Sequence, residues 1–206
     1  MSKPTTEQVL QLVSDLLLPF HGVRRQHKLP VGRRRRENDV EHSWTVSVLA
    51  CALATEIEPG LDVGKIAQYA LVHDLVEVFA GDTKHFVSSD AHKATKAARE
   101  AAALKRIGQD FDTFPWLAKT IGEYEAKSSD EAAFVYAVDK YIAVVYDLLD
   151  EGLYLQQIGI DKAKYDELMA IHRTKAHQHP QVGVYYDEIR DLIDRHPGFM
   201  AAQKAR

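Results

Sequence analysis

Cysteine, glycine, proline and long apolar runs are all scarce in this sequence. Cys51 is the one cysteine among 206 residues, so no disulfide can form within the chain, and a reducing, cytoplasmic setting is expected. The 11 glycines and 7 prolines are too few for a collagen-like or low-complexity chain. The longest uninterrupted apolar run covers residues 48–54, whereas a membrane span needs ~18 residues. The N-terminal residues contain no signal-like apolar stretch, so we expect no membrane segment.

An excess of positive charge is also missing. Acidic residues outnumber Lys and Arg by 30 to 26, which gives a formal net charge of −4. This balance argues against a general nucleic-acid binder, because phosphate backbones are bound through basic surfaces. One basic segment is the exception: it extends from Arg24 to Arg36 and ends in four consecutive arginines. Pro30 and Gly32 disfavour a regular helix in that segment.

What the sequence does have is helical patterning along almost its whole length. The patterns predict helices over residues 9–17, 39–57, 63–80, 91–107, 116–126, 132–149, 162–175 and 182–193. No strand-like alternation of useful length and no internal repeat is present. A chain of 206 residues is of the size of one domain. We therefore predict an all-α fold, a single compact helical bundle over residues 1–206 that includes the helices after residue 150.

Capping residues mark several of the predicted helix ends. Asn38 is a good N-cap, and Glu41, three residues later, matches the second residue of a capping box. Ser128 and Glu131 repeat this pattern before a later helix. Gly81 is expected to end the helix that precedes it in the left-handed conformation.

Three predicted helices carry a metal-ligand residue type on the face that should be buried. His42 heads an apolar stripe near the start of its helix, and His73 shares an apolar face of the next one. Asp74 lies about 100° around the helix from His73. Asp139 interrupts an otherwise apolar stripe. A buried, unpaired carboxylate costs on the order of several kcal/mol, so Asp139 needs a cation or a shifted pKa. The apolar neighbours on these faces are Val46, Leu49, Leu53, Ile66, Ala70, Ala132, Val135, Tyr136, Ile142, Ala143 and Tyr146.

One divalent metal ion would satisfy all of these buried polar groups. Imidazole nitrogens of His42 and His73 and carboxylate oxygens of Asp74 and Asp139 form a mixed ligand set. Such a set suits Mn, Co, Fe, Ni or Zn better than Ca or Mg. Four protein ligands around a six-coordinate ion leave room for water and a substrate oxygen, which is typical of catalytic sites. Taken alone, a buried histidine is more often a hydrogen-bonded core residue than a ligand, and a buried aspartate is more often the partner of a Lys or Arg. The combination on three separate helices is what favours a metal ion.

The same residues follow an order that resembles a known family. His42, the pair His73-Asp74 and then Asp139 are similar to the H…HD…D signature of the HD-domain phosphohydrolases. The local sequences ENDVEHS, HDLVE and GD resemble the EN-x-x-EHS, HD-x-x-E and GD patterns of the branch that includes the bacterial 5′-deoxynucleotidases. The resemblance covers roughly residues 10–149.

The resemblance implies an all-helical fold, one divalent metal ion, hydrolysis of nucleotide phosphate esters and a homodimer. By residue match it implies that the metal ligands are His42, His73, Asp74 and Asp139. Glu77 and Asp82 match acidic residues that act beside the metal on water and substrate. The tryptophan that often follows the family's phosphate-contacting arginine is absent, so selectivity for deoxyribose is not implied.

Individual roles can be assigned on chemical grounds. Glu77 can orient or deprotonate the attacking water, or it can hold a ligand histidine. Asp82 can hold a sugar hydroxyl or a histidine, or be an ordinary turn residue. Guanidinium groups bind phosphate through paired hydrogen bonds. The candidates for substrate binding are Arg24, Arg25 and Arg35, and Lys84 just after the GD pair.

We therefore predict a divalent-metal-dependent phosphohydrolase, a 5′-nucleotidase or phosphomonoesterase acting on (deoxy)nucleoside monophosphates. One alternative is a nucleotide-binding regulatory protein without turnover, which the intact HD-x-x-E and GD patterns disfavour. Another is a helical RNA-binding protein that uses residues 33–36, which the net charge disfavours. The expected partners are a small nucleotide or phosphate ester and a second copy of the chain, with no membrane or nucleic-acid polymer. Trp44 and Trp116 are expected to be core aromatics rather than base-stacking platforms.

Overall fold

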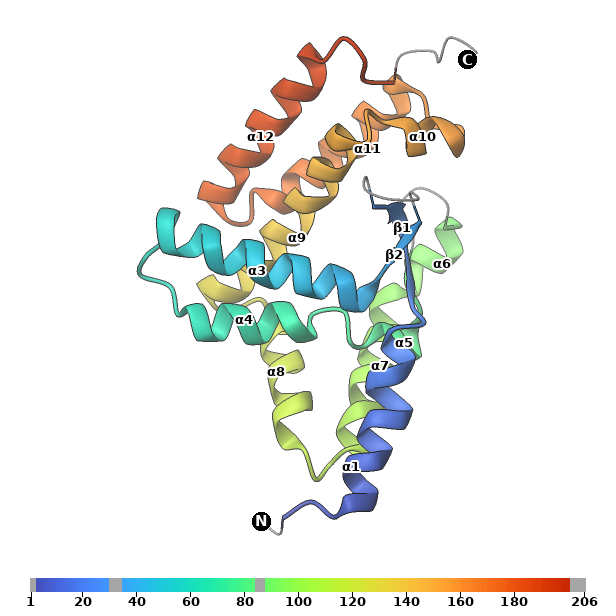
Figure 1. Ribbon diagram of the computed structural model, residues 1–206, viewed down its shortest axis with the longest axis vertical. Helices are drawn as coiled ribbons and strands as arrows, with labels where there is room; N and C mark the ends of the chain where they lie inside the picture. Colours follow the sequence, from blue (N-terminus) through green and yellow to red (C-terminus); the bar gives the residue numbers. More distant parts are fainter. Residues whose placement is uncertain (1–2, 30–34, 84–87, 201–206) are drawn as a thin grey trace.

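The computed structural model describes residues 3–29, 35–83 and 88–200, and within these ranges the chain is mainly helical (Figure 1). The elements are α1 (Thr6–Leu12), the π-helix η1 (Val13–Leu17), α2 (Leu18–Phe20), β1 (Arg24–Lys28), β2 (Arg36–Asn38), α3 (Asp39–Ile57), α4 (Val63–Val72), α5 (Glu77–Ala80), α6 (Asp90–Ala94), α7 (Lys96–Asp110), α8 (Pro115–Ala126), α9 (Asp130–Leu149), α10 (Leu153–Gln157), α11 (Lys162–Ala176) and α12 (Pro180–Arg195). The predicted all-α class is confirmed. None of the described helices combines the length and the apolar character that a membrane span requires.

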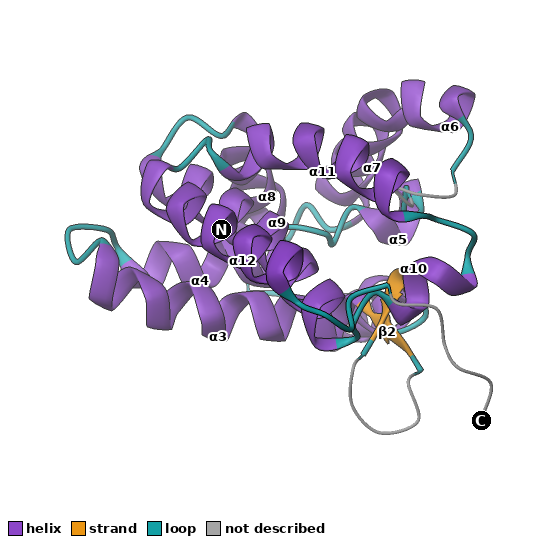
Figure 2. Cartoon of the chain, turned by 90° about the horizontal axis from the view of Figure 1, so that it is seen from above, coloured by secondary structure: helices purple, strands orange, loops and turns teal. Residues whose placement is uncertain are grey.

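Helix α9 is the centre of the fold. It packs against α3 and α4 and, further along, against α11 and α12. Helices α3 and α4 lie side by side across the middle of the molecule, with α1, α7 and α8 at one end and α11 and α12 at the other (Figures 1 and 2). Apolar side chains of α3, α4 and α9 form one buried cluster. Two further clusters lie around α7 and α8 and where α9 meets α11 and α12.

Two helix starts test the predicted caps. The Asn38 side chain accepts a hydrogen bond from the Glu41 N–H at 3.0 Å, and the Glu41 side chain accepts one from the Asn38 N–H at 3.1 Å. This is the predicted capping box. For α9 the prediction is wrong by one residue: the N-cap is Ser129, not Ser128, and its hydroxyl accepts from the Ala132 N–H at 3.2 Å. A cap at 129 places two acidic residues in the first turn, where the helix dipole favours them.

The helix predicted to continue to Gly81 is interrupted in its middle. Helix α4 ends at Val72, and a turn separates it from α5. In this turn the Leu75 N–H bonds to the Val72 carbonyl at 3.0 Å, an i→i−3 bond that tightens the backbone. The turn carries His73 and Asp74, so the two side chains are not held 100° apart on a regular helix. Gly81 closes α5 with a positive φ of 73°, but its ψ of 142° lies outside the predicted left-handed helical conformation.

The structure contains a small sheet that the sequence pattern does not predict. Strands β1 and β2 are antiparallel, with Arg24 opposite Asn38 and Lys28 opposite Arg36. Both strands consist of polar residues, so they lack the apolar alternation that marks a half-buried strand. Strand β2 leads directly into α3, and β1 carries Arg25 toward the middle of the molecule.

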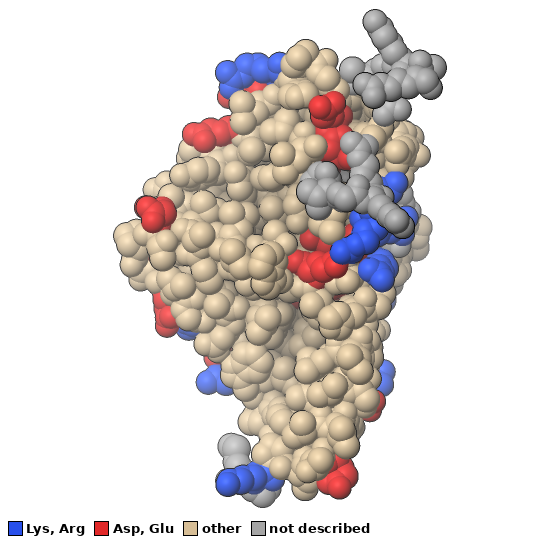
Figure 3. All heavy atoms as spheres, viewed as in Figure 1, with Lys and Arg blue, Asp and Glu red and all other residues tan. Residues whose placement is uncertain are grey.

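Contrary to the prediction, the two tryptophans are not core residues. Trp44 is 67% exposed and Trp116 is 43% exposed. Because α3 turns the stripe headed by His42 toward α4 and α9, Trp44 lies about 200° around the helix, on the outer side. Most of the face seen in Figure 3 is uncharged, and a group of acidic and basic side chains lies right of its centre. Exposed apolar residues on α3 and α4, such as Val48 and Leu71, are consistent with this surface.

Candidate metal centre

Side chains from three separate segments converge near the middle of the molecule. His42 lies near the start of α3, His73 in the turn after α4, and Asp139 in the middle of α9. The Nε2 of His42 lies 2.9 Å from Asp139 Oδ1, and the Nε2 of His73 lies 4.0 Å from the same oxygen. One ligand-type atom from each residue lies within 4.8 Å of the others, and all three residues are buried. One cation can bridge a cluster of this size.

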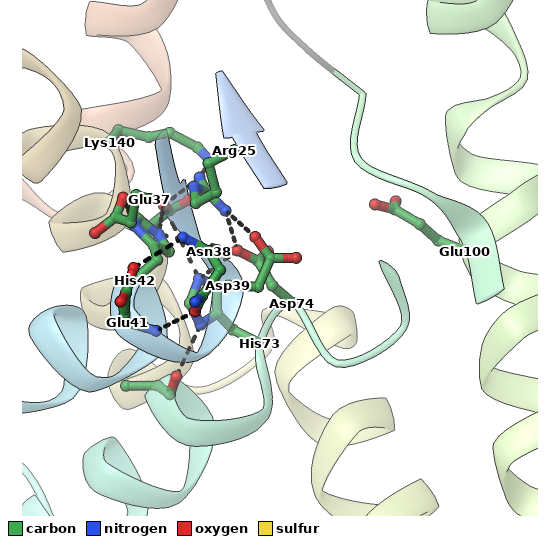
Figure 4. A network of polar contacts seen from close by, with 12 residues as sticks. Arg25, Glu37, Asn38, Asp39, Glu41, His42, His73, Asp74, Glu100 and Lys140 are labelled. Carbon is green, nitrogen blue, oxygen red and sulfur yellow. Dashed lines mark hydrogen bonds and ion pairs between the residues drawn. The ribbon is translucent and has the colours of Figure 1, made fainter. Parts of the chain in front are cut away.

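Asp74 adds a fourth ligand-type group at the same place. Its Oδ2 lies 3.0 Å from His73 Nε2 and 3.9 Å from His42 Nε2. The guanidinium of Arg25 hydrogen-bonds to Asp74 and lies 3.7 Å from Asp139 Oδ1. Figure 4 shows Arg25 beside Asp74, with the two imidazoles below them. The structure therefore brings together the four residues that the sequence names as ligands.

Polar contacts behind the rings orient both imidazoles, a hydrogen bond in His73 and an ion-pair contact in His42. The Nδ1 of His73 lies 2.8 Å from the Ala70 carbonyl oxygen, to which its N–H can donate. The Nδ1 of His42 lies 3.3 Å from a carboxylate oxygen of Glu37, and the Tyr146 hydroxyl donates to the other oxygen at 3.0 Å. Both Nε2 atoms therefore face the cluster, as in histidine ligands held from behind. The sequence analysis assigns no role to Glu37 or Tyr146, although Glu37 lies in the EN-x-x-EHS segment.

The donor chemistry fits a divalent cation. The Nε2 of His73 is buried and makes no hydrogen bond, even though Asp74 Oδ2 is close. When the Nδ1–H of this ring donates to a carbonyl, its Nε2 carries the lone pair that a metal ion requires. Two imidazoles with two carboxylates match the preferences of first-row divalent ions. A double positive charge would also offset the repulsion between Asp74 and Asp139.

Neighbouring charges keep the two aspartates ionised. Burial alone would raise the pKa of Asp74, but the charges of His73 and Arg25 hold it well below its usual range. Burial acts in the same way on Asp139, and its contact with Lys140 holds the pKa of that carboxyl well below its usual range. Both carboxylates are therefore available as anionic ligands.

Two other carboxyl groups are shifted in the opposite direction. Burial, reinforced by the charge of Asp74, raises the pKa of Glu77 well above its usual range. The same two causes raise the pKa of Asp39 to about 7. Neither oxygen of Asp39 has a hydrogen-bond partner within the described chain, and Oε2 of Glu77 has none there either. A raised pKa makes Glu77 a stronger base once it is ionised. Asp39 is a buried carboxyl group that the sequence analysis did not single out.

A cavity of about 380 Å³ opens beside the cluster. Its wall includes Asp74 and Asp139 together with three of the residues predicted to act on substrate, Arg25, Glu77 and Asp82. A guanidinium, a carboxyl group of raised pKa and the two carboxylates of the ligand cluster thus face one space. This arrangement can hold a phosphate group between cationic partners and a proton acceptor.

Other predicted phosphate contacts do not line this cavity. Arg35 is 55% exposed and forms a two-point pair with the Glu41 carboxylate at 2.5 and 2.7 Å. Arg24 is exposed, because neighbouring strand residues face opposite sides and Arg25 takes the inner one. Lys84 lies outside the described residues. Among the arginines of the described chain, Arg25 alone is part of the cavity wall.

Comparisons with known proteins agree with this geometry. A family model described as HD domain matches residues 21–181. The 5′-deoxynucleotidases YfbR of Salmonella paratyphi B and Salmonella newport are each 28% identical to the chain over 149 residues, which is 68% of this chain and 74% of theirs. The crystal structure of a predicted metal-dependent phosphohydrolase from Magnetospirillum magnetotacticum MS-1 superimposes with a TM-score of 0.74 at 28% identity. It covers 98% of this chain and 100% of that one.

Proposed function

The chain belongs to the HD domain family, and from that premise we propose that it is a divalent-metal-dependent phosphohydrolase that cleaves (deoxy)nucleoside 5′-monophosphates. The observation that carries the proposal is the cluster of two imidazoles and two carboxylates, in which both carboxylates line a cavity that also presents Arg25. The YfbR relatives are 5′-deoxynucleotidases, and the Magnetospirillum protein is a predicted metal-dependent phosphohydrolase. These names support the substrate class and the reaction.

In this proposal the metal ligands are His42, His73, Asp74 and Asp139. A divalent cation of the Mn, Co, Fe, Ni or Zn type would supply Lewis-acid chemistry, polarising a phosphoryl oxygen and making a water more acidic. Glu37 lies behind one of the ligands and keeps the Nε2 of His42 directed at the cluster. The protein thus fixes the ligand geometry before substrate binds.

Arg25 and Glu77 have complementary roles toward the substrate. The Arg25 guanidinium is held in the cavity by Asp74 and is directed at the space where a phosphate would lie. Glu77 takes or orients a proton of the attacking water, and its raised pKa suits a general base. Asp82 also lines the cavity, and its carboxylate can accept a hydrogen bond from a sugar hydroxyl of the leaving nucleoside.

The proposal is tested by assaying the purified protein with Mn²⁺ or Co²⁺ against a panel of ribo- and deoxyribonucleoside monophosphates. Release of inorganic phosphate from at least one of them is expected, and its loss on chelation with EDTA should be reversible. Metal analysis of the same sample confirms loading. Tight nucleotide binding without any product, in protein shown to contain metal, would contradict the proposal.

A further inference from the structure

Three lysines from different helices meet beside the metal centre. Lys96 begins α7, Lys140 lies in α9 next to a proposed ligand, and Lys175 lies near the end of α11. All three line the cavity that holds Arg25. The Nζ of Lys140 contacts Asp139, and that of Lys96 contacts Glu100. Two of the three positive charges therefore have a direct carboxylate partner.

Lys175 has no such partner. It makes no hydrogen bond or ion pair within the described part of the chain, and its side chain is partly buried. Burial lowers the pKa of Lys175, and the charges of Lys140 and Lys96 lower it further. Lys175 therefore shares the cavity with two other ammonium groups and, among the described residues, has no carboxylate in direct contact with its own. An anion placed among them would remove the repulsion.

A second cavity gives such an anion its space. It measures about 220 Å³ and is lined by the same three lysines and Lys127, together with the carboxylates Asp74, Glu100, Glu125 and Asp139. Within the described chain, Arg25, Glu77 and Asp82 line only the first cavity. The lysines therefore lie where the two cavities meet. In Figure 4, Lys140 lies close to Arg25, and Glu100 lies apart from the cluster with its carboxylate directed toward it.

We infer that Lys96, Lys140 and Lys175 form a phosphate subsite separate from the position of the reacting phosphate. This inference rests on the proposed function. Arg25 and the ligand cluster account for the reacting group, and the lysines lie beyond it, toward the second cavity. Two sources can supply this phosphate: a second phosphoryl group of the substrate, as in a nucleoside 5′-diphosphate, or free orthophosphate. Lysine suits this role, because its ammonium is a compact charge with three donors that accepts varied phosphate positions.

The kinetic test compares the wild-type protein with Lys175→Gln, using Lys119→Gln as a matched control because Lys119 is 75% exposed. For each, kcat/KM is measured for one nucleoside 5′-monophosphate and its 5′-diphosphate, or the inhibition constant where the compound is not hydrolysed. The inhibition constant of orthophosphate is measured as well. K175Q should weaken the kinetic constant for either the diphosphate or orthophosphate by about tenfold. The constant for the monophosphate should change by less than about threefold. Whichever of the two compounds is affected is the source of the phosphate that the lysines bind. Lys175→Arg should restore most of the loss.

An equal effect of K175Q on monophosphate, diphosphate and orthophosphate would overturn the inference, because Lys175 would then bind the reacting phosphate itself. No effect on any of them would overturn it too. A second measurement does not depend on turnover: calorimetric titration of orthophosphate and pyrophosphate into metal-free protein at low salt. Binding that K175Q loses and K119Q keeps supports the subsite even if no ester is hydrolysed. That result would separate a failure of the proposed function from a failure of the subsite.

Discussion

At the scale of the single residue, Asp139 distinguishes a metal centre from an ordinary ion-paired core. Its Oδ1 faces both imidazoles, and its other oxygen contacts Lys140. Asp139→Asn keeps the shape but removes the anionic ligand, so bound metal and turnover should each fall by about 100-fold or more. Metal content by elemental analysis and the helical circular dichroism signal check this. Asp110→Asn, at a largely exposed position on α7, is the control. Metal and activity retained in D139N would show that Asp139 is not a ligand.

Asp39 allows a prediction about pH. Its pKa of about 7 lies above the usual value near ~3.9, so the folded protein holds a proton that the unfolded chain releases. Stability from this group is therefore lost as the pH rises from about 4 to about 7 and stays low above that range. In metal-free protein, Asp39→Asn should stabilise the fold more at pH 8 than at pH 5. Urea unfolding of both proteins at the two pH values measures this difference. An equal effect at both would show that Asp39 ionises normally.

The site residues differ in how far the sequence reveals them. Asp139 and the two histidines can be predicted, because a polar ligand type on an apolar helical face is unusual without a partner. Glu37 and Asp39 cannot be predicted, because their roles depend on contacts with distant residues, Tyr146 in the case of Glu37 and Asp74 in the case of Asp39. The choice of Arg25 over its neighbour likewise depends on which side of β1 faces inward.

At the scale of the element, the start of α3 links the cap to the metal centre. Asn38 caps the helix, and His42 lies in the next turn. Asn38→Ala removes the side-chain acceptor and should cost about 1 kcal/mol in the free energy of unfolding. Asn38→Ser should cost less, because serine is also a good N-cap. Urea titrations of the three proteins test this order. Alanine and serine variants of equal stability would contradict a capping role.

The elements also show where sequence patterns fail. Long helices such as α3 and α9 are predicted because their apolar periodicity persists over several turns. The tight turn that carries His73 is not, because its residues continue the helical pattern while i→i−3 bonds bend the chain. The sheet of β1 and β2 is not predicted either, because pairing between two polar segments leaves no periodic signal. Both misses lie at the site, where local pattern and final structure disagree most.

At the scale of the whole molecule, the proposed ligands come from elements that are far apart in the sequence. They belong to α3, to the turn after α4 and to α9, which pack against one another around the core. Occupation of the centre therefore ties together the main helices of the fold. The homodimer that the family resemblance implies remains a prediction, which sedimentation of the purified protein can test.

This arrangement predicts that metal binding stabilises the entire fold. A cation that binds only the folded state adds about 2.7 kcal/mol at a free concentration 100 times its Kd. For a chain of this size, that corresponds to a rise in Tm of roughly 5–10 °C. Calorimetric scans with Mn²⁺ and after EDTA should show this shift in the wild type and in D110N. In D139N the shift should be much smaller. An equal shift in D139N would place the stabilising metal elsewhere on the protein, and the assignment of the centre to these helices would fail.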